Sequence, residues 1–186
     1  MNAKKLLFYT LAVLLGGCVP SLHQLYTDKD LVFDENLLGA WADDDTRWAF
    51  QKGADPNSYK LAVTDDEGKG EFVAHLVKID DMLFLDLFPE EPKLEQSNDF
   101  YKMHLVGAHT FIKVEQIEPI LQMRVMNPEQ IEKMLENDPN LLKHEKIQDR
   151  IILTASPKEL QRFMRKYANV DEVFGDSSDL KRVEPE

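Results

Sequence analysis

The feature that most limits how this chain can fold is a two-residue alternation of apolar and polar side chains. Residues 47–51 and 59–64 alternate cleanly, and the turn sequences GADPN and DDEGKG follow them. Successive side chains of a β-strand point to opposite faces, so this period predicts strands with one buried face. The alternation therefore favours a sheet built from consecutive short strands.

Two neighbouring segments, residues 71–79 and 82–88, are apolar on both faces, which is typical of strands covered on both sides. Asp80-Asp81 between them predicts a two-residue hairpin turn. In that register His75 lies opposite Asp86 on one face of the sheet. We expect the two side chains to touch, either as a satisfied buried pair or as a polar anchor in a ligand cavity. A catalytic dyad would also need a nucleophile, and the chain has no G-x-S-x-G motif.

Two helix starts appear late in the chain. Asn127 before Pro128 predicts a cap for a helix through residue 137, and Ser156 with Glu159 predicts a capping box for a second helix. The remaining strands are predicted at residues 101–106, 110–117, 120–126 and 150–155, with a short one at 180–183. The fold class is therefore mainly β: an antiparallel meander closed or half-closed into a barrel, with two amphipathic helices packed on it.

The first residues form a segment of different composition. Lys4 and Lys5 are basic, and residues 6–15 carry no charge. This apolar run is shorter than the roughly 20 residues that span a bilayer, and small residues follow it, as in a secretory signal peptide. We therefore predict that residues 1–17 are a signal peptide and that residues 31–186 form a single β-rich domain.

The sequence Leu15-Gly16-Gly17-Cys18 resembles the lipobox of bacterial lipoproteins, and Cys18 is the single cysteine of the chain. The resemblance implies cleavage between Gly17 and Cys18 and a covalent lipid on Cys18, with no other cofactor. Residues 18–30 would then be a lipidated cysteine and a tether. Val19 in place of aspartate favours the outer membrane of a bacterial cell envelope.

Composition limits the partners that this chain can bind. Its 34 acidic and 22 basic residues give a net charge of −12. Nucleic acid selects basic surfaces, so this balance excludes a nucleic-acid partner. It also opposes docking on anionic lipid by charge, so the lipid on Cys18 is the predicted link to the membrane.

After a predicted helical turn at residues 35–38, Gly39-Ala40-Trp41 is similar to the G-x-W motif that opens lipocalins. Lipocalins are eight-stranded barrels that hold small apolar ligands, and the resemblance implies that Trp41 closes the barrel floor beneath Arg182. The candidate cavity or anchor residues are thus Trp41, His75, Asp86 and Arg182. The alternative is that Trp41 anchors the core of an unrelated meander, since lipocalins carry their long helix after the last strand.

The chain as a whole resembles small bacterial lipoproteins that combine a lipobox, a G-x-W entry, strands and capped helices. We expect a non-catalytic binding module for a small apolar ligand or a peptide. The alternative is an assembly lipoprotein that binds another envelope protein through a sheet edge or a helix face. No metal site is predicted, because His144-Glu145 lacks the second histidine of H-E-x-x-H.

Overall fold

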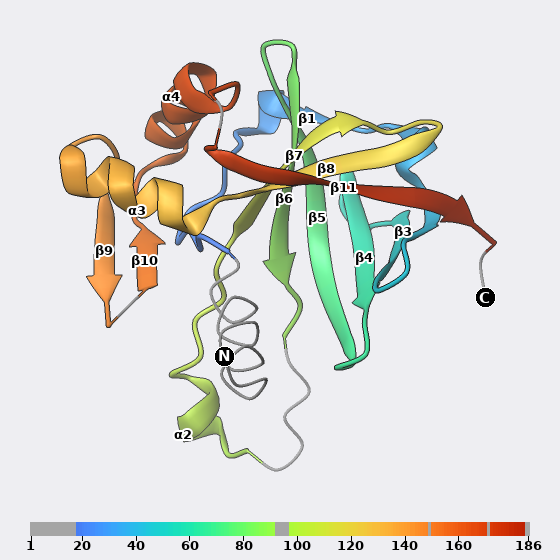
Figure 1. Cartoon of the computed structure of the whole chain (residues 1–186). Helices are drawn as coiled ribbons and strands as arrows, with labels where there is room; N and C mark the ends of the chain where they lie inside the picture. The colour runs from blue at the N-terminus through green and yellow to red at the C-terminus, as the bar shows by residue number, and fades with distance from the viewer. Residues whose placement is uncertain (1–17, 92–96, 149, 171, 185–186) are drawn as a thin grey trace, which may run out of the picture.

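The main feature of the fold is a closed antiparallel barrel of eight strands (Figure 1). The computed structural model describes residues 18–91, 97–148, 150–170 and 172–184. Each strand pairs with the next, and the last strand pairs with both β8 and β2, which closes the ring. The strands are β2 (Gly39–Ala42), β3 (Arg47–Lys52), β4 (Ser58–Thr64), β5 (Lys69–Ile79), β6 (Met82–Pro89), β7 (Thr110–Gln116), β8 (Ile120–Met126) and β11 (Phe174–Val183).

The elements outside the ring are short. A two-residue strand, β1, pairs with Leu76 and Val77 of β5, beyond the part of β5 that pairs with β4. A separate hairpin, β9–β10, lies beside the helices α3 and α4 on the left of Figure 1. The bounds are η1 (Asp28–Asp30), β1 (Leu31–Val32), η2 (Glu35–Leu37), α2 (Asp99–Lys102), α3 (Pro128–Asn137), β9 (His144–Ile147), β10 (Arg150–Leu153) and α4 (Pro157–Tyr167).

The two ends of the barrel differ in their connections. At the end we call the closed end, η2 leads into β2 and the turns at 53–57 and 80–81 are short. At the opposite end, called the open end, lie the two long connections, β6–β7 and β8–β11. Both predicted helices belong to the second of these connections, so they precede the last strand.

Two apolar clusters lie on opposite faces of the barrel wall. The inner cluster takes one or two buried side chains from every strand: Trp41, Phe50, Tyr59, Leu61, Ala74, Leu76, Leu85, Leu87, Ile112, Val114, Leu121, Met123 and Leu180. The outer cluster joins the outward side chains of β5–β8 to α3, α4 and the N-terminal segment: Val77, Ile79, Phe84, Phe111, Met126, Ile131, Leu135, Leu160, Phe163, Met164, Val19 and Leu25. The prediction that residues 71–79 and 82–88 are covered on both sides is confirmed for most of both strands, but Lys78 and Phe88 are exposed.

The free tether predicted for residues 18–30 is wrong for most of that segment. Val19 and Leu25 are buried in the outer cluster. Ser21 pairs with His109 at the start of β7, and its neighbours bond the backbone of Leu153 at the end of β10. The apolar side chains and the backbone pairing hold this segment against the barrel, where it links β7 to the β9–β10 hairpin.

The strand predicted at residues 101–106 is also wrong. This part of the chain forms the single turn of α2 and an exposed loop. β6 and β7 already pair with each other from Leu83 to Leu87, so the segment finds no partner strand. Backbone pairing, rather than alternation alone, decides whether a segment is a strand.

In the part of the chain that the structure describes, none of the helices combines the length and the hydropathy that crossing a membrane requires.

Candidate functional site

The closed end is built around Trp41, which has no exposed surface. Its indole Nε1 donates a hydrogen bond to the carbonyl of Leu37 at 2.9 Å, and the guanidinium carbon of Arg182 lies 4.2 Å from the ring centroid. Arg182 also donates to the carbonyl oxygens of Leu38, at 2.8 Å, and of Asn36. The contact that the lipocalin resemblance implies between tryptophan and arginine is present, and it ties the first strand to the last.

Gly39 makes this packing possible. Its φ of +113° lies where side chains other than glycine are strained. A Cβ there would also lie 2.9 Å from Nη1 of Arg182. The glycine of the motif therefore serves the close approach of the arginine.

The barrel interior is solid toward the closed end. Six side chains from five different strands there are at most 1 % exposed, so they border no water-sized void: Trp41, Tyr59, Leu61, Leu76, Leu85 and Leu121. Inward-facing side chains nearer the open end are only partly buried: Trp48, Val63, Phe72 and Val125. Any space for a ligand inside the barrel is therefore a shallow mouth rather than a deep calyx.

The predicted pairing of His75 with Asp86 is confirmed in register, but its surroundings are not those of the barrel cavity. The side chain of Asp86 points to the outer face of the barrel wall and is 1 % exposed, because the N-terminal segment covers it. Its carboxylate accepts a hydrogen bond from the backbone N–H of Leu25 at 2.7 Å and lies 2.6 Å from Nδ1 of His109. The carboxylate of Asp86 is thus satisfied by His109 and by the backbone rather than by His75.

His75 completes this outer cluster without a hydrogen bond to the carboxylate. Its ring packs on that of Tyr26, with centroids 4.6 Å apart. Burial lowers the pKa of His75, although the charge of Asp86 opposes that shift. Burial and the same carboxylate raise the pKa of Tyr26. The arrangement holds the N-terminal segment against the barrel.

Sequence reasoning did not identify His109 as the partner of Asp86. Phe111 lies opposite Asp86 across β6 and β7, so His109, two residues earlier, points to the same face. The register between β6 and β7, which a long connection separates, is needed to place this diagonal contact, and no local pattern in the sequence gives it.

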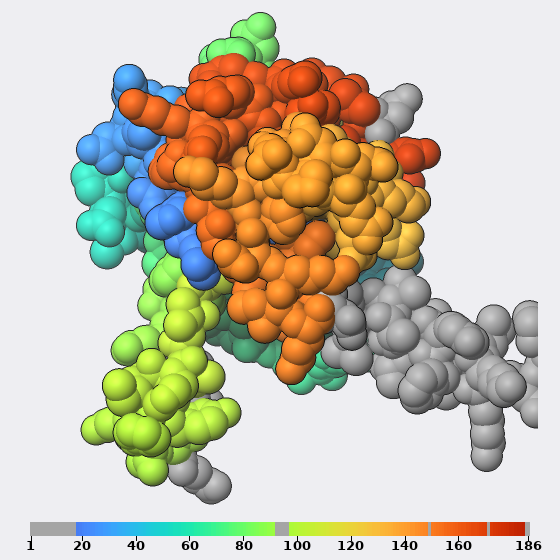
Figure 2. Space-filling view, turned by 90° about the vertical axis from the view of Figure 1, so that its left-hand side faces the viewer, coloured from blue at the N-terminus to red at the C-terminus, as the bar shows by residue number. Residues whose placement is uncertain are grey.

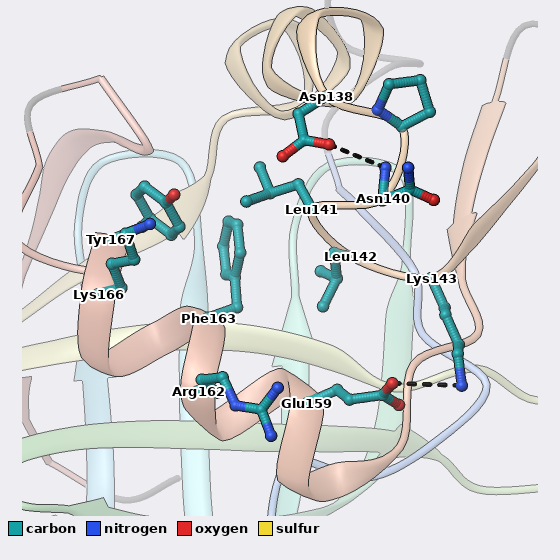
Figure 3. A pocket seen from close by; sticks show the side chains of 11 residues that line it. Asp138, Asn140, Leu141, Leu142, Lys143, Glu159, Arg162, Phe163, Lys166 and Tyr167 are labelled. Carbon is teal, nitrogen blue, oxygen red and sulfur yellow. Dashed lines mark hydrogen bonds and ion pairs between the residues drawn. The ribbon is translucent and has the colours of Figure 1, made fainter.

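A surface groove lies beside α4 (Figure 3). It has a volume of about 440 Å³ and lies between α4 and the loop that follows α3. Figure 3 shows Phe163 and Tyr167 rising from α4 toward Leu141 and Leu142, which make an apolar floor. The remaining lining residues are Asp138, Pro139, Asn140, Lys143, Glu159, Arg162 and Lys166.

The rim of this groove is more basic than the protein around it. Three basic side chains, Lys143, Arg162 and Lys166, face two acidic ones, in a chain of net charge −12. Glu159 is engaged by Lys143 at 3.2 Å and by its own helix cap. Among the described residues, Arg162 has neither an ion-pair nor a hydrogen-bond partner, so its guanidinium is available to a ligand.

The structure describes Cys18 of the predicted lipid site but not the residues before it. Cys18 is exposed. Gly17 and the rest of the predicted signal peptide lie outside the described residues. Within the described ranges, no three His, Cys, Asp or Glu side chains gather closely enough to hold a metal ion.

Comparison with known proteins does not assign this chain to a family. No protein-family model, no curated protein and no solved structure matches this chain.

Proposed function

We propose that this protein is a lipid-anchored, non-catalytic binding module of a bacterial cell envelope. The barrel is the rigid scaffold, and Cys18 carries the anchor. The ligand occupies the groove between α4 and residues 138–143 and is a small apolar molecule or a peptide segment with an anionic group. The groove carries this proposal because it combines an apolar floor with an unpaired arginine.

The chemistry of the groove supports a ligand of two parts. Phe163, Tyr167 and the two leucines offer apolar contact to a chain or ring. Arg162 offers the planar pair of N–H donors that suits a carboxylate or a phosphate. The solid closed half of the barrel directs the ligand to this outer groove rather than to a deep calyx.

The test measures, by fluorescence, the binding of a dansyl-labelled fatty acid, which has an apolar chain and a carboxylate. We expect Arg162→Glu to weaken binding by about tenfold, because the charge that meets the carboxylate is reversed. Lys158→Glu is the matched control, since Lys158 is exposed on the same helix but does not line the groove. Equal affinity of the two variants, or no binding to the parent protein, contradicts the proposed groove.

The assembly alternative is restricted to a small surface by closure of the barrel. Strands of a closed ring have no free edge. In the described residues the edge strands are β9, β10 and the two-residue β1, and the N-terminal segment already bonds β10 at Leu153. Ile147 of β9 is 57 % exposed. A partner that adds a strand would therefore bind at β9.

A further inference from the structure

The connection between β6 and β7 carries the most exposed apolar surface of the described chain. Asn98 caps α2 by accepting from the N–H of Tyr101, and the loop then returns to β7. Figure 2 shows this part, in yellow-green, as a lobe that stands out from the body of the molecule. The exposed side chains are Phe100 at 72 %, Tyr101 at 57 %, Met103 at 71 %, Leu105 at 46 % and Val106 at 77 %.

This lobe, residues 98–107, is electrically neutral in an acidic protein. Its two formally charged side chains are Asp99 and Lys102, and they lie 3.8 Å apart as an ion pair. His104 turns its Nδ1 back to the carbonyl of Phe100 at 2.7 Å. The apolar side chains are therefore presented without a net charge, although the chain carries −12.

The segment that follows Cys18 meets the chain that follows the lobe. Two backbone hydrogen bonds join Ser21 to His109, at 2.9 and 2.8 Å, where the lobe returns to β7. Val19 and Ser21 are buried, so the chain is fixed up to the residue after Cys18. Phe88 packs on the ring of His109 and, like Leu22, is partly exposed beside this junction.

We infer that the lobe inserts into the leaflet of the lipid bilayer that receives the acyl chains of Cys18. The inference rests on the lipid anchor of the proposed function. Apolar side chains that enter the boundary between headgroups and acyl chains add apolar contact to such an anchor, and the exposed side chains of the lobe offer that contact. A neutral apolar surface needs no anionic lipid, which suits an acidic protein.

The insertion fixes how the barrel stands on the membrane. The lobe belongs to the open end, as do the β4–β5 turn and the partly buried mouth side chains. The closed end with Trp41 and Arg182 then points away from the lipid, and the groove beside α4 is left on the flank of the barrel.

The test measures the depth of an indole placed in the lobe. The full-length protein is purified from membranes as the variant Phe100→Trp and placed in phosphatidylcholine vesicles with or without brominated acyl chains, which quench indole fluorescence on contact. Ile147→Trp is the matched control, because Ile147 is exposed to a similar degree on the β9–β10 hairpin. The parent protein supplies the background of Trp41 and Trp48, and the intact mass of each sample reports acylation of Cys18.

We expect Phe100→Trp to be quenched by about twofold more than Ile147→Trp after the background is subtracted, because interfacial aromatic side chains lie within reach of the acyl chains. Equal quenching in an acylated sample overturns the insertion of the lobe and leaves the anchor standing. Selective quenching of an unacylated sample overturns the anchor and supports the lobe as a membrane contact in its own right. Insertion of the lobe is therefore tested by the quenching, and the lipid anchor is tested by the intact mass.

Discussion

At the scale of single residues, Asp86 has the largest consequences. Its buried carboxylate joins three parts of the chain: the N-terminal segment through Leu25, the start of β7 through His109, and its own strand β6. A buried charge is costly unless it is hydrogen-bonded, and here both carboxylate oxygens are engaged. Asp86 therefore helps to hold residues 18–30, which the sequence predicts to be a tether, against the domain.

We predict that Asp86→Ala lowers the free energy of unfolding by about 3 kcal/mol, because it leaves the N–H of Leu25 buried without an acceptor and removes the partner of His109. Urea unfolding followed by circular dichroism measures the loss. Asp44→Ala, in the exposed β2–β3 turn, is the control and is expected to stay within about 0.5 kcal/mol of the parent. A loss no larger than that of the control would show that the N-terminal segment is held by its apolar contacts alone.

At the scale of elements, the two helices in the β8–β11 connection are defined by their first residues. The side chain of Asn127 accepts from two backbone N–H groups at the start of α3. In α4, Ser156 and Glu159 form the reciprocal capping box that the sequence predicts. These caps satisfy N–H groups that have no partner within the helix. Because few residue types can do this, the helix starts can be predicted from the sequence.

The capping box of α4 predicts a specific pH dependence. Hydrogen bonds from the Ser156 hydroxyl and backbone N–H, together with Lys143, lower the pKa of Glu159 to about 2. A lowered pKa means that the folded state favours the carboxylate. Its contribution to stability is therefore complete above the ordinary value of 4.5 and is lost as the pH falls toward about 2.

We predict that Glu159→Gln is less stable than the parent at pH 7 and that this difference shrinks at pH 3. At pH 3 the unfolded parent binds a proton on Glu159, whereas the folded carboxylate, with a pKa of about 2, stays mostly ionised. Urea unfolding at the two pH values measures the difference. Glu136→Gln, exposed near the end of α3, serves as the reference for removal of an acidic side chain. A difference that is the same at both pH values would mean that the carboxylate of Glu159 does not stabilise α4 through its charge.

At the scale of the whole molecule, Arg182 links the first and last strands of the barrel. It lies on the last strand, stacks on Trp41 of the first barrel strand and donates to the carbonyls around η2. Glu118, in the β7–β8 turn, accepts from the same guanidinium at 3.1 Å. Closure of the barrel thus depends on backbone pairing of β11 and on this single side chain at the closed end.

We expect Arg182→Ala to cost about 2 kcal/mol of stability, from the lost cation–π contact and the two carbonyls left without their donor. Thermal unfolding measures the loss, and the emission maximum of Trp41 should shift to longer wavelength as water reaches the ring. Lys181→Ala, at the exposed neighbouring position of β11, should behave as the parent protein. If both variants unfold at the same temperature, the arginine does not contribute to closure.

The sequence alone determined the local features of this protein. The Asp80-Asp81 turn with its register, the bounds of α3, the start of α4 and the short helical turn before Gly39 all follow from alternation, turn residues and caps. Each of these depends on side chains within a few positions of one another, so no distant partner is needed to read them.

Tertiary structure decided the features that need a distant partner. Residues 101–106 alternate like a strand but have no free edge to pair with, whereas β11 runs through the polar Gly175 to Asp179 because β8 offers it an edge. His109 bonds Asp86, and Val19 and Leu25 are buried, only because the barrel brings β6 and β7 beneath the N-terminal segment. These features depend on backbone hydrogen bonds and on apolar area buried between segments that are far apart in sequence. Neither produces a pattern within a single segment.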